Sequence, residues 1–162
     1  EIHALYIQDK IKAMIAIPHG EGFGLPIFEA AYSALPIISV GWSGQCDFLY
    51  DENKQKHFYD IAYDINKVPA EAVWEGVIEE NSGWAYARET SAKEKMRECY
   101  NDIINEASDS IALSSCARAQ ILLNTRTPET MYEQFVDCVI DKAELEAIQT
   151  EVQGLLDDLD LL

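Results

Sequence analysis

The stretch IKAMIAIPHGEGFGLPIFEAAYSALPIISV, residues 11–40, holds two apolar runs separated by a glycine-rich segment and a helix-forming segment. The runs IKAMIAI (residues 11–17) and PIISV (residues 36–40) are typical of short strands buried on both faces of a parallel sheet. Between them, PIFEAAYSAL has proline at a first helical position and good helix formers after it. This stretch therefore predicts a strand, a loop, a helix and a second strand, with the loop at the carboxyl edge of the sheet, where α/β proteins bind ligands.

The remainder of the chain continues this α/β pattern and becomes helical toward its C-terminus. Residues 57–65 have the composition of a strand, and residues 73–87 that of a loop or a short strand. Helical composition or helix-start signals mark four later segments: residues 91–107, residues 111–123, the segment after Thr127-Pro128, and the segment after Asp141. We expect a first domain over residues 1–125, with helices on both faces of its sheet, and a C-terminal helical segment over residues 126–162.

Charge and cysteine spacing exclude several classes of partner. The 12 Lys and Arg residues against 29 Asp and Glu residues give a formal net charge of -17, which repels nucleic-acid phosphates and anionic lipid headgroups. A nucleotide ligand remains compatible, because backbone amides and a helix N-terminus can bind phosphate in an acidic protein. The four cysteines form no CxxC pair, so they indicate neither a zinc site nor a disulfide framework. The sequence has no apolar run near the roughly 18 residues of a membrane span and no leader, so we expect a cytoplasmic protein.

The segment that carries chemistry is HGEGFGLPIFE, residues 19–29. Its glycines at positions 20, 22 and 24 leave little side-chain bulk, so that a ligand can approach the backbone closely. The following helix would present free N–H groups and its positive dipole end to a diphosphate. The competing interpretation is a tight strand-to-helix turn without a ligand.

Two carboxylates favour the binding interpretation. Glu21 stands between two glycines of the loop, and Glu29 follows it on the helix with seven residues between them. A carboxylate accepts two hydroxyl groups at once, as a sugar or a ribose would offer them. Glu29 has the alternative role of stabilising the N-terminal end of its own helix.

The run EGFGLPIFE resembles the E-x7-E signature of retaining glycosyltransferases of the GT-B type, especially the GT4 group, whose members commonly read EGFGLPxLEA. The continuation EAAYSALPIISV keeps the same register, and GWSGQCDFL is similar to the glycine loop that follows the next strand in that family. The resemblance is specific over residues 1–49, fainter over residues 84–100 and absent beyond them.

This resemblance implies a Rossmann-like parallel sheet, the second half of the C-terminal, nucleotide-sugar-binding domain of a GT-B fold. It implies that Glu21 is catalytic and lies beside the donor sugar, and that Glu29 binds the ribose. The donor, of UDP or GDP type, would be bound by His19, Gly22, Phe23, Gly24, Leu25, Glu29, Ser43 and Gly44, with no metal and no cofactor. His19 stands where the family usually has a small residue; it would either reach a phosphate or cap the strand.

The resemblance also implies missing parts. An arginine and a lysine that grip the diphosphate, and the acceptor-binding N-terminal domain, would precede residue 1, so we expect a fragment that is inactive alone. The alternatives are a non-catalytic module that binds nucleotides or sugar nucleotides, and an enzyme similar to a sugar-nucleotide epimerase. The upstream sequence would discriminate among them.

The last helix is expected to carry an apolar seam. Spacings of three and four residues place six side chains on one face: Leu145, Ile148, Val152, Leu155, Leu159 and Leu162. This seam would either close the core of its own domain or dock on the missing N-terminal domain. In the fragment, the second alternative means docking on a second copy of the chain, or fraying beyond Gly154, which disfavours helix.

Overall fold

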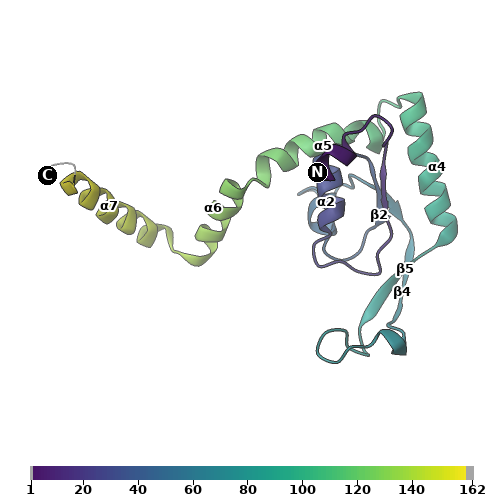
Figure 1. The fold of residues 1–162 in the computed structure, drawn as a ribbon, viewed down its shortest axis with the longest axis horizontal. Helices are drawn as coiled ribbons and strands as arrows, with labels where there is room; N and C mark the ends of the chain where they lie inside the picture. The colour runs from purple at the N-terminus through teal and green to yellow at the C-terminus, as the bar shows by residue number, and fades with distance from the viewer. Residues whose placement is uncertain (1, 160–162) are drawn as a thin grey trace. The chain divides into compact units, whose positions relative to one another are not determined.

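The computed structural model describes residues 2–159 and divides into two units, Glu1–Leu122 and Leu123–Leu162. The first unit is an α/β structure around a three-stranded parallel sheet, drawn in Figure 1. Its strands are β1 (Met14–Ala16), β2 (Ile37–Val40) and β3 (Tyr59–Ile61), and they lie in the order β1-β2-β3. All three strands therefore end at one edge of the sheet, and so do the loops that follow them.

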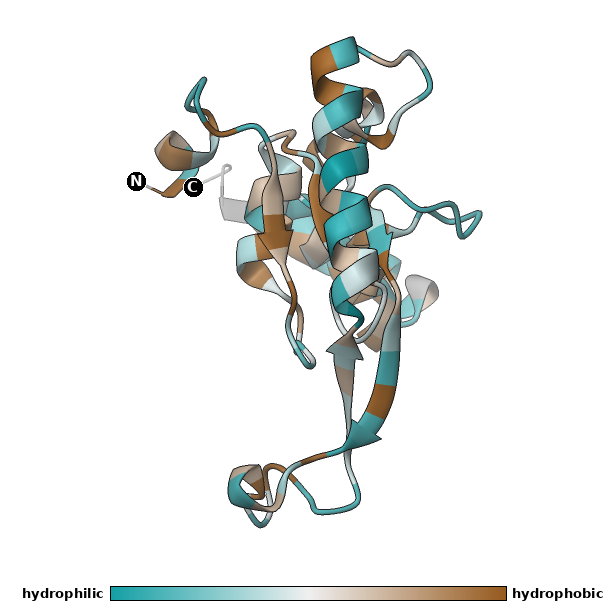
Figure 2. Ribbon diagram, turned by 90° about the vertical axis from the view of Figure 1, so that its right-hand side faces the viewer, coloured by the Kyte–Doolittle hydropathy of each residue, from teal (hydrophilic) through white to brown (hydrophobic). Residues whose placement is uncertain are grey.

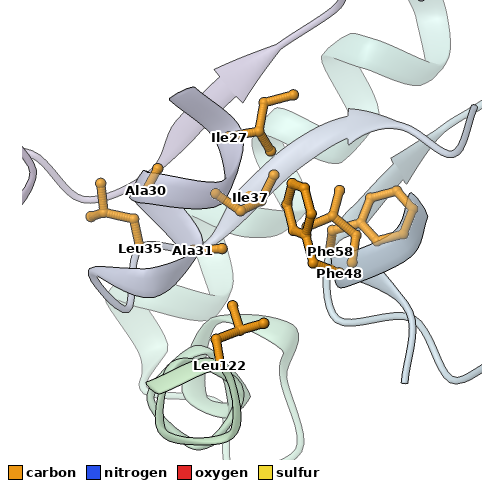
Figure 3. Packing of buried hydrophobic residues seen from close by; sticks show 9 residues of the cluster. Ile27, Ala30, Ala31, Leu35, Ile37, Phe48, Phe58 and Leu122 are labelled. Atoms are coloured by element: carbon orange, nitrogen blue, oxygen red, sulfur yellow. The ribbon is translucent and has the colours of Figure 1, made fainter. Parts of the chain in front are cut away.

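The central strand β2 is buried on both faces, as its apolar sequence predicts. Ile37 joins one core cluster, whereas Ile38 and Val40 join another, because successive side chains of a strand point to opposite faces. The first cluster, shown in Figure 3, draws on β2 and on α2 (Leu25–Tyr32), α3 (Cys46–Leu49) and α5 (Ile111–Thr125). The second cluster adds side chains from β3 and from α4 (Glu89–Asn105). Helices thus cover both faces of the sheet.

Strand β1 differs from the expectation of burial on both faces. Ile15 is 43% exposed, and Ile17, just beyond the strand, is 44% exposed. Among residues 2–159, β1 pairs with β2 alone, and α4 packs mainly on β2 and β3. The apolar run correctly predicts a strand, but its position at the edge of the sheet leaves one face of β1 half covered.

The expected strand over residues 57–65 is divided in two. The chain turns at Ala62, whose N–H donates to Ser91 Oγ (2.9 Å) and whose carbonyl accepts from the Arg88 N–H (2.8 Å). Beyond this turn, β4 (Tyr63–Lys67) pairs antiparallel with β5 (Gly83–Ala87) in a separate hairpin. Figure 2 shows this hairpin running away from the parallel sheet. Its distal loop contains the short 3-10 helix η1 (Ala70–Ala72).

The remaining helices are α1 (Ile2–Tyr6), α6 (Pro128–Val139) and α7 (Lys142–Leu159). Helix α6 begins as expected, with Pro128 in its first turn and the side chain of Thr127 accepting a hydrogen bond from the Thr130 N–H. Before α7, Asp141 Oδ1 accepts from the Ala143 N–H (2.8 Å).

The seam of α7 is exposed beyond Leu145, whose side chain is partly buried. Ile148, Val152 and Leu155 are exposed. The side chain of Leu159 and the whole of Leu162 lie outside the described residues. No helix within residues 2–159 has both the length and the apolar composition that a membrane span requires.

Candidate functional site

The loops that follow β1 and β2 are hydrogen-bonded to each other at the carboxyl edge of the sheet. The carbonyl of Glu21 accepts from Ser43 Oγ (2.6 Å) and from the Gly44 N–H (3.0 Å). The Glu21 N–H in turn donates to Ser43 Oγ (3.1 Å). Three hydrogen bonds therefore hold the backbone of the predicted catalytic residue.

Glycine at position 44 is required for this contact. A Cβ atom on Gly44 would lie 2.0 Å from the Gly22 carbonyl oxygen, far inside contact distance. Next to it, Ser43 has a left-handed backbone with φ of 74°. The second loop thus accepts an unfavourable serine conformation in order to approach the first loop closely.

Gly24 marks the entrance to α2. It adopts φ of 85°, a conformation that glycine reaches without strain, and its carbonyl accepts from the N–H groups of Ile27 and Phe28, each at 2.9 Å. A Cβ atom here would lie 3.3 Å from the Cβ of Gln45. Gln45 is fully buried and donates to the Val40 carbonyl (3.1 Å), so that it anchors the second loop to the end of β2.

Four consecutive backbone N–H groups at this point have no hydrogen-bond partner within residues 2–159 and are called the open amides below, although Gly24 itself is buried. The amides of Gly22, Phe23, Gly24 and Leu25 donate to no acceptor among the residues that the structure describes. They precede or open α2, where unpaired amides and the helix dipole favour an anion. The arrangement can accept a phosphate or another negatively charged group.

The side chains of this segment divide between the core and the surface. The ring of Phe23 lies 5.3 Å from that of Phe28 and 5.1 Å from that of Phe48, so it packs at the margin of the core. The side chain of Leu25 is exposed. Phe23 and Leu25 can therefore serve a ligand through their backbone amides.

The two carboxylates are half-buried and unpaired. Neither the Glu21 nor the Glu29 side chain has a hydrogen-bond or ion-pair partner within residues 2–159. Glu29 follows Leu25 by four residues and so lies one turn further along the same face of α2. No contact joins the two carboxylates, and their facing one groove stays a prediction.

His19 has partners that its position in the sequence does not reveal. Its Nδ1 lies 2.7 Å from the Ala85 carbonyl, and its ring stacks on that of Trp84 with centroids 4.9 Å apart. On the second loop, Trp42 contacts Tyr63 in β4, with ring centroids 6.1 Å apart. The sequence does not reveal the β4–β5 hairpin as a neighbour of the site, because no local pattern relates residue 19 to residue 85.

An acidic side chain that binds the start of the second loop is paired with a lysine. Asp60 Oδ1 accepts from the Gly41 N–H (3.0 Å), while its other oxygen binds Lys56 (2.6 Å). The hydrogen bond to Asp60 raises the pKa of Lys56, so this lysine stays charged. In the described part of the chain, no three His, Cys, Asp or Glu side chains are grouped so that they could hold a metal ion.

Comparison of the chain with protein-family models, with curated proteins and with solved structures found no match. Assignment to a family therefore depends on the signature residues and on the geometry around them.

Proposed function

We propose that this chain binds the diphosphate of a nucleotide-sugar donor over residues 22–25, as part of a retaining glycosyltransferase of the GT-B type. The observation that carries the proposal is the row of four open amides at the start of α2, beside the unpaired carboxylates of Glu21 and Glu29. The first amides of any helix lack intrahelical partners, so the two unpaired carboxylates beside them are what distinguish this turn.

Each part of the site has a role in this proposal. The open amides bind the pyrophosphate, and Glu29 accepts hydrogen bonds from the ribose hydroxyls. Glu21 lies beside the donor sugar, where its negative charge stabilises the positive charge that develops on the ring as the diphosphate leaves. Catalysis of this kind depends on positioned charge and needs no metal or cofactor from this chain.

The fold supports the proposal at a coarser level. A parallel sheet with helices on both faces binds ligands at its carboxyl edge, where the two loops that are hydrogen-bonded to each other lie. This architecture is compatible with a Rossmann-like half-sheet. In the intact enzyme, the acceptor domain would close over this edge, and the isolated chain would transfer no sugar.

An NMR titration of the ¹⁵N-labelled chain with UDP and with GDP tests the proposal. Without the basic residues that the resemblance places upstream, we expect a Kd on the order of 1 mM, equivalent to about 4 kcal/mol. The amide shifts should be confined to residues 20–29 and to Ser43 and Gly44. Saturable shifts elsewhere, or none at about 10 mM nucleotide, would contradict the proposed site.

The variant Glu29→Gln separates a specific site from general anion binding. It should weaken binding about tenfold, because the amide accepts the ribose hydroxyls less strongly than a charged carboxylate. The matched control is Glu129→Gln in α6, which should leave the affinity unchanged. Conversion of a UDP-sugar to its epimer in the absence of an acceptor would favour the epimerase alternative instead.

A further inference from the structure

The β4–β5 hairpin leaves the sheet at the same edge as the two site loops and contacts both of them. It begins one residue after β3, at Tyr63, whose hydroxyl donates to the Gly41 carbonyl at the end of β2 (3.2 Å). From its other strand, Ala85 and Trp84 contact His19 at the start of the glycine loop. Two independent contacts therefore join the hairpin to the site.

The contact between His19 and Ala85 uses both backbone groups of one strand residue. In a β-strand, the N–H and the C=O of a residue point to the same side. Ala85 directs its N–H to the His19 carbonyl (2.9 Å), while its own carbonyl faces His19 Nδ1 (2.7 Å). His19 thus pairs with the outer edge of β5 through its backbone and its side chain together.

This geometry determines which ring nitrogen of His19 carries hydrogen. A carbonyl oxygen only accepts hydrogen bonds, so Nδ1 must be the donor to Ala85. In the neutral ring, Nε2 is then an acceptor and has no hydrogen to offer a phosphate. The imidazole is engaged with the hairpin rather than free for the ligand.

Aromatic packing reinforces the contact. Trp84 and Tyr86 are two residues apart on β5 and so lie on the same face of the strand, with the His19 ring against both. The imidazole is nearly parallel to the indole, at an interplanar angle of 2°, and its centroid lies 4.5 Å from that of Tyr86. Stacked rings of this kind add to the burial of apolar area.

We propose that His19 is a positioning residue, which fixes the start of the glycine loop on the hairpin and thereby determines where the open amides of residues 22–25 lie. Glycine-rich backbone loses more conformational freedom on ordering than any other, so an anchor at its first residue reduces that loss on ligand binding. The effect of His19 on nucleotide affinity depends on the proposed donor site. Its effect on the conformation of the loop does not.

The replacements His19→Asn and His19→Gln provide a matched test in the full chain. The side-chain N–H of asparagine falls close to the position of Nδ1 and can still donate to Ala85, whereas that of glutamine falls near Nε2 and cannot. His3→Gln, a change in an exposed histidine of α1, is the control. Amide shifts of residues 20–25, hydrogen exchange at Ala85 and UDP affinity by NMR are the three readouts.

We expect His19→Gln to accelerate exchange at Ala85 and to weaken UDP binding, each up to about tenfold, as the loss of one hydrogen bond allows. In His19→Asn, both the exchange rate at Ala85 and the UDP affinity should stay close to the wild-type values. His3→Gln should change neither. Equal behaviour of the two His19 variants, or faster exchange at Ala85 with unchanged UDP affinity, would overturn the positioning role.

The outcomes also separate this proposal from the proposed function. If the wild-type chain binds no UDP, the donor site is wrong, and the amide shifts of residues 20–25 alone test the anchor. The anchor is supported if these shifts change in His19→Gln and stay close to the wild-type values in His19→Asn. It is overturned if they are unchanged in His19→Gln. If His19→Gln does not fold, Trp84→Leu removes the stacking ring and keeps both hydrogen bonds to Ala85. The same loop shifts and UDP affinity should then change in Trp84→Leu, and unchanged values would overturn the proposal.

Discussion

Single residues decide how closely the two site loops approach each other. Gly44 lies against the Gly22 backbone, and Ser43 hydrogen-bonds both backbone groups of Glu21. The position of Glu21 therefore depends on residues of another loop, not on its own side chain. The close approach requires glycine at position 44 but not at position 22, because a Cβ atom at Gly22 would meet nothing within 4 Å.

The replacement Gly44→Ala should separate the two loops. Its methyl group would overlap the Gly22 carbonyl oxygen, so the backbone must move, at a cost of about 2 kcal/mol in the free energy of unfolding. Gly22→Ala is the control and should change stability by less than about 1 kcal/mol. Denaturant unfolding of both variants measures the difference. Equal stabilities would mean that Gly44 does not lie against the Gly22 backbone as described.

At the scale of elements, one buried side chain joins a strand to two helices. The Tyr59 hydroxyl on β3 donates to Asp102 Oδ2 of α4 (2.8 Å) and accepts from the Ala112 N–H at the start of α5 (3.1 Å). Burial, and then the hydrogen bond to Asp102, raise the pKa of Tyr59, so its hydroxyl keeps its hydrogen. This junction fixes α4 and the first turn of α5 against β3.

The replacement Tyr59→Phe should destabilise this junction. It leaves the Asp102 carboxylate and the Ala112 N–H without their shared partner, which should lower the free energy of unfolding by about 1 to 3 kcal/mol. Tyr132→Phe on the surface of α6 is the matched control, because that tyrosine is 72% exposed. Thermal unfolding followed by circular dichroism compares the two, and an equal effect would show that the hydroxyl of Tyr59 contributes nothing.

At the scale of the whole molecule, the chain consists of one unit with a core and one unit without buried side chains among its described residues. Both core clusters consist of residues up to Leu122. From Leu123 onward, α6 and α7 expose apolar side chains, among them Phe135, Val139 and Val152. The stability of the first unit should therefore depend little on the last helix.

Deletion of residues 142–162 tests this independence. The melting temperature should change by less than about 2 °C, because none of the α7 side chains that the structure describes belongs to either core cluster. A loss of 10 °C or more would instead place the seam of α7 in the core of this chain. Light scattering on the same two proteins tests docking on a second copy, which the deletion would convert to a monomer.

Several elements of the fold follow from local sequence patterns alone. The apolar run of residues 36–40 predicts the doubly buried β2, and Thr127 with Pro128 predicts the start of α6. The glycines of residues 20–24 correctly predict a loop between a strand and a helix. These features depend on neighbours a few positions away, so periodicity, caps and glycine content suffice to find them.

Contacts between residues far apart in the chain are visible in the folded structure and not in the sequence. The half exposure of β1 follows from its place at the sheet edge, and the turn at Ala62 follows from contacts with residues 88–91. The pairing of His19 with Ala85 spans 66 positions. Local periodicity contains no information about such contacts, because the order of the strands and the path of the hairpin determine them. Local patterns could therefore nominate candidate site residues, but not the hairpin that contacts His19.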